Sequence, residues 1–251
     1  MEINNPFLLE GKKILVTGAS SGIGKQIAIV LAKQGAIPFI VARRKEKLRE
    51  TISLFPEKIA SKFYVCDLTE FEEIKVLTDN IDKLDGVIFN AGIIDYVPIK
   101  VLTPERVRNI FAINFDSQVM LTQQLLNKRK INSNASLVYI SSISTHLGVP
   151  GTAIYAASKA AMTSFAKVLA SELSSKKIRV NVISPGIIKT KLFDVVSHKL
   201  NTDVFEKDEV SYPLGFGAPE DIANAVTFLI SDSAKWITGT EMILDGGFTL
   251  K

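Results

Sequence analysis

The chain has 251 residues, of which 47% are hydrophobic and 22% are charged, a balance that excludes an intrinsically disordered protein. Its 30 basic and 26 acidic side chains leave a net charge of +4, an excess too small to predict a nucleic-acid-binding protein. No run of about 18 apolar residues predicts a membrane span, and the start MEINNPFLLEGKK lacks the features of a signal peptide.

Short apolar segments alternate with longer amphipathic segments along the chain. The predicted strands are 13–17, 37–42, 62–66, 86–90, 136–141, 178–184 and 241–245, and the predicted helices lie near 23–34, 70–80, 104–127, 155–174 and 219–231. Several strands are apolar on both faces, which is typical of a parallel sheet covered by helices on each side. The alternation predicts one doubly wound α/β domain, residues 1–251, with a central sheet of about seven parallel strands.

The first predicted strand leads directly into the segment TGASSGIG, and a helix follows it. Backbone N–H groups of a glycine-rich turn and the positive end of a helix dipole together bind phosphate groups. The residues expected at this phosphate site are Gly18, Ser20, Ser21, Gly22, Ile23 and Gly24. A Walker A loop is excluded because Ala19 and Gln26 stand where that loop requires Gly and Ser or Thr. A glycine-rich turn without a ligand is the alternative.

Seven segments in order resemble the short-chain dehydrogenase/reductase family: TGASSGIG, NAG at 90–92, Asn114, Ser142, YAASK at 155–159, PG at 185–186 and DGG at 245–247. The resemblance runs from Lys12 to Phe248, although the glycine spacing departs from the usual G-x-G-x-x-G fingerprint. It implies a Rossmann-type fold and an oxidoreductase that uses a nicotinamide cofactor to interconvert CH–OH and C=O groups.

The end of the second strand bears on the choice between NAD(H) and NADP(H). An acid at this place would bind the ribose hydroxyls of NAD and repel a 2′-phosphate, whereas an arginine does the reverse. The chain has Ala42, Arg43 and Arg44 here, with no acid before Glu46. We therefore expect NADP(H), with Arg43 as the main partner of the 2′-phosphate and Arg44 as its helper. A solvated basic helix start is the alternative.

The third strand ends at Cys66, which is the only cysteine. It cannot form an internal disulfide, so a reducing, cytoplasmic location is expected. Asp67, with Leu68 beside it, resembles the acid with which family members contact adenine. The alternative for Asp67 is a cap for the next helix, and both roles are compatible.

The fourth strand is followed by Asn90, Ala91 and Gly92, which are expected at the sheet edge where doubly wound folds bind ligands. Phe89 replaces an Asn that family members usually carry before this segment. We expect Phe89 to face inward and to cause local repacking without loss of binding.

Tyr155 and Lys159 lie four residues apart, on one face of the helix after the fifth strand. Such a pair is common by chance, but it fits carbonyl reduction, in which the substrate oxygen must receive a proton as hydride arrives. A nearby ammonium would lower the pKa of the phenol. Ser142 is expected to hydrogen-bond the same oxygen; its rival Ser141 should face the opposite side of the strand. The resemblance implies that Asn114 holds a water near Lys159.

The segment SPGIIKT follows the sixth strand and resembles the family segment that holds the nicotinamide carboxamide. It implies Pro185 and Gly186 at the turn and contacts from Ile188 and Thr190, with a helix cap as the alternative for Thr190. The region 189–214 is long and irregular, which is typical of a lid or binding loop. Its apolar residues, which fit a hydrophobic substrate, are Leu192, Phe193, Val195, Val196, Leu200 and Phe205. His146 and His198 show no ligand-like pattern, so no metal site is expected.

The compact length and the ending of the chain look most like the 3-oxoacyl-[acyl-carrier-protein] reductases of fatty acid biosynthesis. That resemblance implies an acyl-thioester substrate and acyl carrier protein as a candidate partner, and it implies a homotetramer built with the last helix and strand. Basic residues at 128–130 and 176–177 would attract an acidic carrier, but topology places them opposite the carboxyl edge. The alternatives are a steroid, a sugar or another small secondary alcohol or ketone as substrate, and a regulator that binds nucleotide without turnover.

Overall fold

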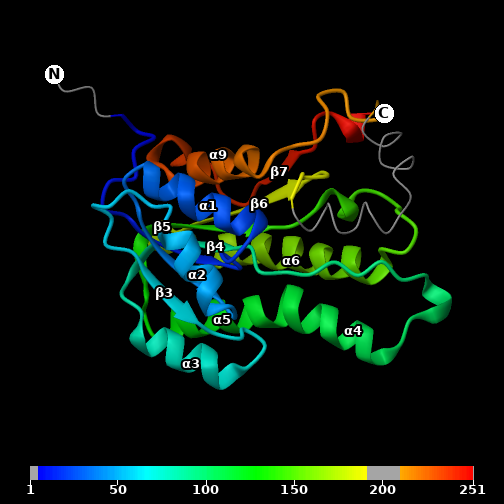
Figure 1. Cartoon of the computed structure of the whole chain (residues 1–251), viewed down its shortest axis with the longest axis horizontal. Helices are drawn as coiled ribbons and strands as arrows, with labels where there is room; N and C mark the ends of the chain where they lie inside the picture. The colour runs from blue at the N-terminus through cyan, green and yellow to red at the C-terminus, as the bar shows by residue number, and fades with distance from the viewer. Residues whose placement is uncertain (1–4, 191–209, 251) are drawn as a thin grey trace.

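A computed structural model describes residues 5–190 and 210–250 of the chain. Its centre is a seven-stranded sheet in the order β3-β2-β1-β4-β5-β6-β7, and every neighbouring pair of strands is parallel. Helices cover both faces of the sheet (Figure 1). The predicted doubly wound, Rossmann-type fold is confirmed.

The strands are β1 Lys13–Thr17, β2 Ile37–Ala42, β3 Lys62–Val65, β4 Leu84–Phe89, β5 Ile131–Ile140, β6 Arg179–Pro185 and β7 Glu241–Leu244. The helices are α1 Gly22–Lys33, α2 Lys45–Ile52, α3 Phe71–Asn80, α4 Pro104–Phe111, α5 Ser117–Asn127, α6 Ala153–Glu172 and α9 Pro219–Ile230. Short helical turns are η1 Ile99–Val101, the π-helical η2 Ala112–Asp116, η3 Ile143–Thr145, η4 Ser174–Lys176, η5 Asp232–Ala234 and η6 Phe248–Leu250. None of the helices in the described ranges is both long and apolar enough to cross a bilayer.

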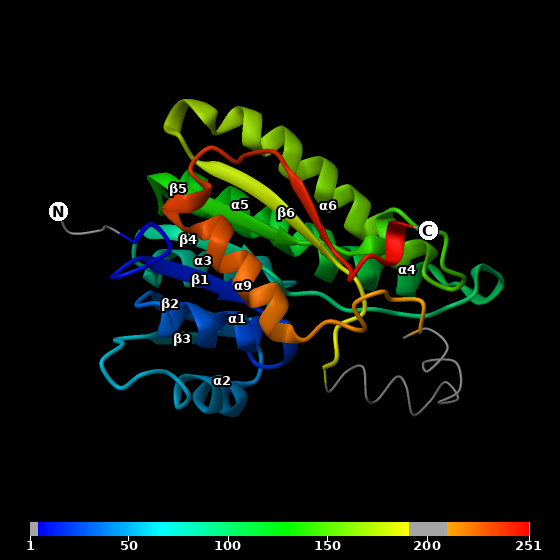
Figure 2. The same cartoon turned by 90° about the horizontal axis from the view of Figure 1, so that it is seen from above.

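Alternating side chains of the strands supply two hydrophobic cores. On β1, Ile14 and Val16 pack with α1 and α9 on one face, whereas Leu15 packs with α3, α5 and α6 on the other. Figure 2 shows α1 and α9 lying across the same side of the sheet. All three β1 side chains are fully buried, as expected for a strand covered on both sides.

Three elements differ from the sequence-based prediction. Helix α2, Lys45–Ile52, was not predicted, since only Leu48 and Thr51 of its eight residues are buried and the apolar period is too weak to see. The helix predicted at 104–127 is interrupted by the π-helical turn η2. Strand β5 begins at Ile131, earlier than predicted, because its polar start pairs with β4 before a register shift.

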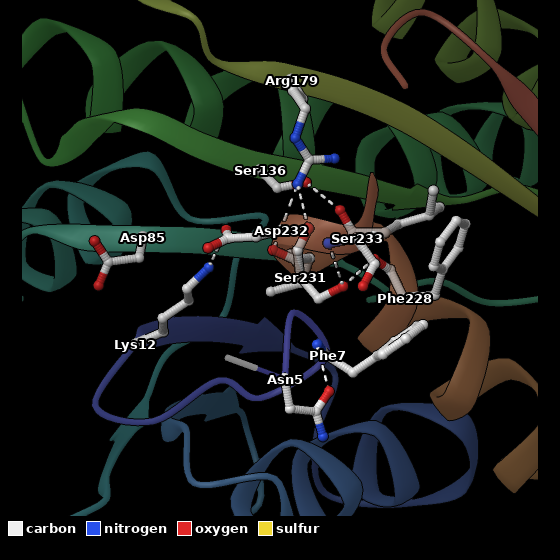
Figure 3. Close-up of polar contacts among 12 residues, drawn as sticks. Asn5, Phe7, Lys12, Asp85, Ser136, Arg179, Phe228, Ser231, Asp232 and Ser233 are labelled. Carbon is white, nitrogen blue, oxygen red and sulfur yellow. Dashed lines mark hydrogen bonds and ion pairs between the residues drawn. The ribbon is translucent and has the colours of Figure 1, made fainter. Parts of the chain in front are cut away.

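The amino edge of the sheet is closed by contacts among distant segments (Figure 3). Arg179 of β6 donates through Nη2 to the carbonyl oxygens of Ile230 and Ser231 at the end of α9, at 3.4 and 3.2 Å. Lys12 forms an ion pair with Asp232 at 2.7 Å. These contacts connect β6 to the end of α9, and the residue before β1 to η5.

The basic residues considered for carrier docking also belong to this amino edge. Lys128 donates to Asp79 Oδ1 at 2.6 Å, and Lys130 donates to the carbonyl of Ile81 at 2.7 Å. Both ammonium groups therefore bind the end of α3 within their own chain, which confirms the topological argument that they lie away from the carboxyl edge.

Candidate active site

Most predicted site residues lie in the turns after the strands, so the fold gathers them at one edge of the sheet; Asn114 lies in η2, and Tyr155 and Lys159 lie on α6. The glycine turn follows β1, Asn90 follows β4, Ser142 follows β5 and Gly186 follows β6. Phe89, the last residue of β4, is fully buried and stacks on the ring of Tyr139 at 4.2 Å. It faces inward as predicted.

The glycine turn packs against the turn after β4 too closely for larger residues. Gly18 has a φ of +66°, and a Cβ added there would lie 2.9 Å from Asn90 Nδ2. A Cβ added at Gly24 would lie 2.6 Å from the carbonyl oxygen of Gly18. Thr17 joins the two turns, because its hydroxyl accepts from the backbone N–H of Asn90 and of Ala91 at 3.0 Å each. These two glycines are therefore required for the turn itself.

The start of α1 has the features expected of a phosphate site. Its N-cap residue, Ser21, makes no side-chain capping bond, and the first turn of the helix contains no acid. Arg44 Nη2 instead reaches across to Ser20 Oγ at 3.0 Å and Ser21 Oγ at 2.9 Å. Free N–H groups, hydroxyls and a guanidinium thus converge where a phosphate would bind.

Arg43 points to a different neighbour. Its Nη1 lies 3.4 Å from Asp67 Oδ2, and 66% of its side chain is exposed. Asp67 is not the cap of the next helix, since Glu70 occupies the N-cap of α3; instead it accepts from the N–H of Thr69 at 3.0 Å and caps the turn before that helix. The two arginines therefore contact different segments: Arg44 contacts the glycine turn, and Arg43 contacts the turn after β3.

A cavity of about 330 Å³ connects these groups. It is lined by Gly18, Ser20, Ser21, Val41, Ala42, Arg43, Arg44, Cys66, Asp67, Leu68, Thr69, Ala91, Gly92, Ile93, Ile113 and Ser117. Val41, Cys66, Thr69, Ile93, Ile113 and Ser117 were not predicted, because small or apolar residues at strand ends, in turns or on helices carry no distinctive signal. Apolar walls with cationic and N–H donors at one end fit a nucleotide cofactor.

Tyr155 lies near the start of α6, next to the turn that carries Ser142. Burial raises the pKa of Tyr155 to about 12, while a hydrogen bond with Ser142 lowers it and nearby Tyr96 raises it further. The phenol is therefore protonated at neutral pH. Ser142 Oγ also accepts from the backbone N–H of Ser144 at 3.2 Å, which orients the hydroxyl.

Lys159 is 4% exposed, and its Nζ donates to the carbonyl oxygen of Ile140 at 2.8 Å. Burial lowers the pKa of Lys159 to about 8. The Nζ atom lies 6.0 Å from the centre of the Tyr155 ring. The sequence analysis expected the ammonium to lower the pKa of Tyr155, but burial is the dominant influence on the phenol in this structure.

Asn114 sits in the π-helical turn η2 and is completely buried. Its amide holds both backbone groups of Ile93: Oδ1 accepts from the N–H at 2.8 Å and Nδ2 donates to the carbonyl at 2.9 Å. A Cβ added at Gly92 would lie 3.2 Å from both Asn114 Oδ1 and Lys159 Nζ. The fold thus brings the polar ends of Asn114 and Lys159 to one side of Gly92.

Ser141, the rival to Ser142, faces away from the cleft. Its hydroxyl lies 3.0 Å from Thr163 Oγ1 and donates to the carbonyl of Lys159 at 3.2 Å, and the residue is 3% exposed. Ser142 instead shares a hydrogen bond with the phenol of Tyr155, so the two serines have different partners on α6.

The segment after β6 reaches back to the glycine turn. Ile188 forms a parallel bridge with Gly217, and the side chain of Thr190 lies 3.7 Å from where a Cβ on Gly22 would stand. A Cβ on Gly186 would meet Asp245 and Tyr212 at 3.0 Å. Residues 191–209, which include most of the predicted substrate loop and its apolar residues, lie outside the described ranges.

His146 has a carboxylate partner that the sequence analysis missed. Its Nε2 lies 2.8 Å from Glu241 Oε1, a contact across 95 residues that no local pattern could reveal. Over residues 5–190 and 210–250, no group of three or more His, Cys, Asp and Glu side chains is arranged to hold a metal ion.

Comparisons with known proteins agree with this geometry. A family profile described as "Enoyl-(Acyl carrier protein) reductase" matches residues 18–249. The 3-oxoacyl-[acyl-carrier-protein] reductase FabG of Rickettsia felis is 36% identical over 244 residues, which cover 96% of this chain and 98% of the relative. FabG of Thermotoga maritima is 32% identical over 250 residues, covering 96% and 99%.

Two solved structures have the same fold over nearly their whole lengths. A short-chain type dehydrogenase/reductase from Mycobacterium marinum superposes with a TM-score of 0.88 at 28% identity, covering 98% of each chain. A putative NAD(P)-dependent gluconate 5-dehydrogenase from Beutenbergia cavernae, with bound NADP at low occupancy, superposes with a TM-score of 0.89 at 28% identity. That match covers 98% of this chain and all of the other.

Proposed function

The chain belongs to the short-chain dehydrogenase/reductase family and is an oxidoreductase with a nicotinamide cofactor, and on that premise we propose that it reduces a ketone to a secondary alcohol with NADPH. The observation that carries the proposal is the placement of a protonated phenol, a serine hydroxyl and a buried amine at one edge of the sheet. The cofactor supplies the hydride when it is bound.

The phenol of Tyr155 acts as the proton donor in this proposal. Its pKa, raised to about 12 by burial, keeps the proton on the oxygen until negative charge develops on the substrate carbonyl. Ser142 shares a hydrogen bond with that phenol and holds the carbonyl oxygen in line with it. The N–H of Ser144 orients the Ser142 hydroxyl, so little reorganisation of that hydroxyl is needed when the carbonyl arrives.

Lys159 and Asn114 assist proton transfer from the phenol in this proposal. The ammonium of Lys159 lies 6.0 Å from the centre of the Tyr155 ring and stabilises the phenolate that remains after proton transfer. Asn114 holds the backbone of Ile93 beside Gly92 and, with Lys159, provides polar atoms for a water that returns a proton to the site.

NADPH is the favoured cofactor because two guanidinium groups and no carboxylate follow β2. Arg44 already contacts the hydroxyls of Ser20 and Ser21. Arg43 lies beside Asp67, with most of its side chain exposed. A 2′-phosphate between them would gain charge-assisted hydrogen bonds. Gly18, Gly22, Ile188 and Thr190 complete the proposed cofactor site, along with the remaining residues of the cavity.

The proposed substrate is a 3-oxoacyl thioester carried by acyl carrier protein. Curated relatives at 32–37% identity over nearly the whole chain bear that activity in their names. A small polyol ketone is the second candidate, supported by the structural neighbour described as a gluconate 5-dehydrogenase. We also propose a homotetramer, in which the last helix and strand form an interface.

A substrate panel with NADPH tests the proposal directly. The purified protein should oxidise NADPH with an acetoacetyl thioester, and Tyr155→Phe should lose activity by about three to four orders of magnitude while its affinity for NADPH stays near that of the wild type. Turnover of a sugar or polyol ketone in place of the thioester would select the second candidate. NADPH binding without turnover of any ketone would identify a nucleotide-binding regulator, and an active Tyr155→Phe variant would refute the mechanism.

A further inference from the structure

Three polar side chains from distant parts of the chain meet beside β7. Glu241, the first residue of β7, accepts a hydrogen bond at Oε1 from Ser184 Oγ of β6 at 2.6 Å. The same oxygen lies 2.8 Å from His146 Nε2. The Glu241 side chain is 11% exposed and that of His146 is 38% exposed.

The protonation of this cluster follows from its contacts. Burial raises the pKa of Glu241, but hydrogen bonds from Ser184 and His146 and the nearby charges of His146 and Lys167 oppose it, and the net effect lowers that pKa. Glu241 is therefore a carboxylate at neutral pH and only accepts hydrogen bonds. It follows that Nε2 of His146 carries the hydrogen.

The cluster holds the far end of the turn that presents Ser142. The near end is fixed to the sheet, because the N–H of Ser141 donates to the carbonyl of Ile183 at 2.7 Å. Within the turn, Thr145 donates through N–H and Oγ1 to the carbonyl of Ser142, and the N–H of His146 donates to Ile143 at 2.8 Å. His146 ends this turn, only four residues after Ser142.

We propose that His146 and Glu241 are positioning residues for Ser142. The two anchors, Ser141 on the sheet and His146 on Glu241, leave the Ser142 turn little freedom to shift. Lys167 on α6 is the other charged group that acts on Glu241 among the described residues, and Ser184 on β6 is its neutral donor. The inference rests on the proposed reductase function.

A looser turn would let Ser142 shift away from the phenol of Tyr155. A displaced Ser142 lowers kcat more than it changes cofactor binding, because its hydroxyl acts at the reacting oxygen.

Three variants measured with NADPH and the best ketone of the panel test the inference. His146→Ala and Glu241→Gln should each lower kcat about three- to tenfold, with the KM for NADPH changed by less than about twofold. His146→Gln keeps an N–H donor toward Glu241, so it should recover most of kcat. If His146→Ala does not fold, the two glutamine variants carry the test.

Lys12→Gln is the matched control, because it breaks an ion pair of similar length at the opposite edge of the sheet. It should leave kcat unchanged. A thermal-unfolding cycle over His146→Ala, Glu241→Gln and the double variant adds a readout independent of activity: the combined loss of Tm should be smaller than the sum of the single losses.

Two results would overturn the inference while the proposed function stands. One is wild-type kcat in both His146→Ala and Glu241→Gln. The other is an equal loss of kcat in all three variants, His146→Gln included. A wild-type protein that turns over no ketone would be a different failure, since it removes the proposed function and the inference together.

Discussion

At the scale of single residues, burial makes Lys159 a source of instability. Its pKa falls from 10.5 to about 8, which corresponds to roughly 3 kcal/mol of cost for the charged side chain. Between about pH 8 and 10.5 the unfolded chain binds more protons at this residue than the folded chain does. The free energy of unfolding contributed by Lys159 therefore rises with pH in that window, and the cost is fully present below pH 8.

Lys159→Met should consequently stabilise the protein at pH 7. The removed cost is partly offset, because the carbonyl of Ile140 loses its donor, so the net gain should be about 1–2 kcal/mol. The gain should shrink as the pH approaches 10, and reductase activity should be lost at every pH. Denaturant unfolding at pH 7 and pH 10 measures the difference, and a destabilised variant at pH 7 would contradict the assigned burial cost.

Arg43 and Arg44 carry the prediction on cofactor choice. Arg43→Asp and Arg44→Asp should each raise the KM for NADPH relative to that for NADH by about tenfold or more, since each loses a charge-assisted contact and adds repulsion. Arg49→Asp makes the same change of charge on the exposed side of α2, where its partner is Glu46, and should leave the ratio nearly unchanged. Equal ratios in all three variants would mean that only overall charge matters.

The placement of site residues could be predicted where a periodicity or a strand end determined it. The end of β5 placed Ser142 at the carboxyl edge, and the four-residue spacing placed Tyr155 and Lys159 together. The bond from Lys159 to the carbonyl of Ile140 could not be predicted, because it depends on how α6 lies on the sheet. The same holds for the contact between His146 and Glu241.

At the scale of elements, buried strands were predicted best and surface helices worst. Strands β1 and β2 have the predicted bounds, because apolar runs bounded by polar residues leave little choice of register. Helix α2 was missed since it covers only the margin of the sheet. The π-helical turn at Asn114 was also missed, because its extra residue serves the bonds to Ile93 and leaves no periodic signal.

The capping of α9 by Arg179 leads to a prediction on stability alone. Arg179→Leu removes the donors to Ile230 and Ser231 and should lower the free energy of unfolding by about 1–2 kcal/mol. Its kcat should match the wild type, because the contact lies at the amino edge. Arg49→Leu breaks an exposed pair within one helix and should cost much less. Equal losses in denaturant unfolding would mean that the cap adds nothing.

At the scale of the whole molecule, one edge of the sheet holds structural contacts and the other holds the candidate active site. The amino edge is tied together by contacts between segments as distant as Lys12 and Asp232, whereas the carboxyl edge collects glycines, hydroxyls and cations around a cavity. The order of motifs along the chain predicted this division, since parallel strands end at a common edge. The homotetramer, by contrast, is expected only from the family resemblance.

The last strand and its approach carry exposed apolar side chains that the proposed homotetramer would bury. Trp236, the only tryptophan, is 96% exposed, and Ile243 on β7 is 40% exposed.

Sedimentation should give about 110 kDa for four chains of 27.5 kDa. Ile243→Asp should lower that mass and shift tryptophan emission to longer wavelength, because the indole returns to water. Val76→Asp on α3, 63% exposed and away from β7, is the control. A wild-type protein that sediments as a monomer would show that there is no interface. Equal effects of Ile243→Asp and Val76→Asp would mean that the interface does not lie at β7.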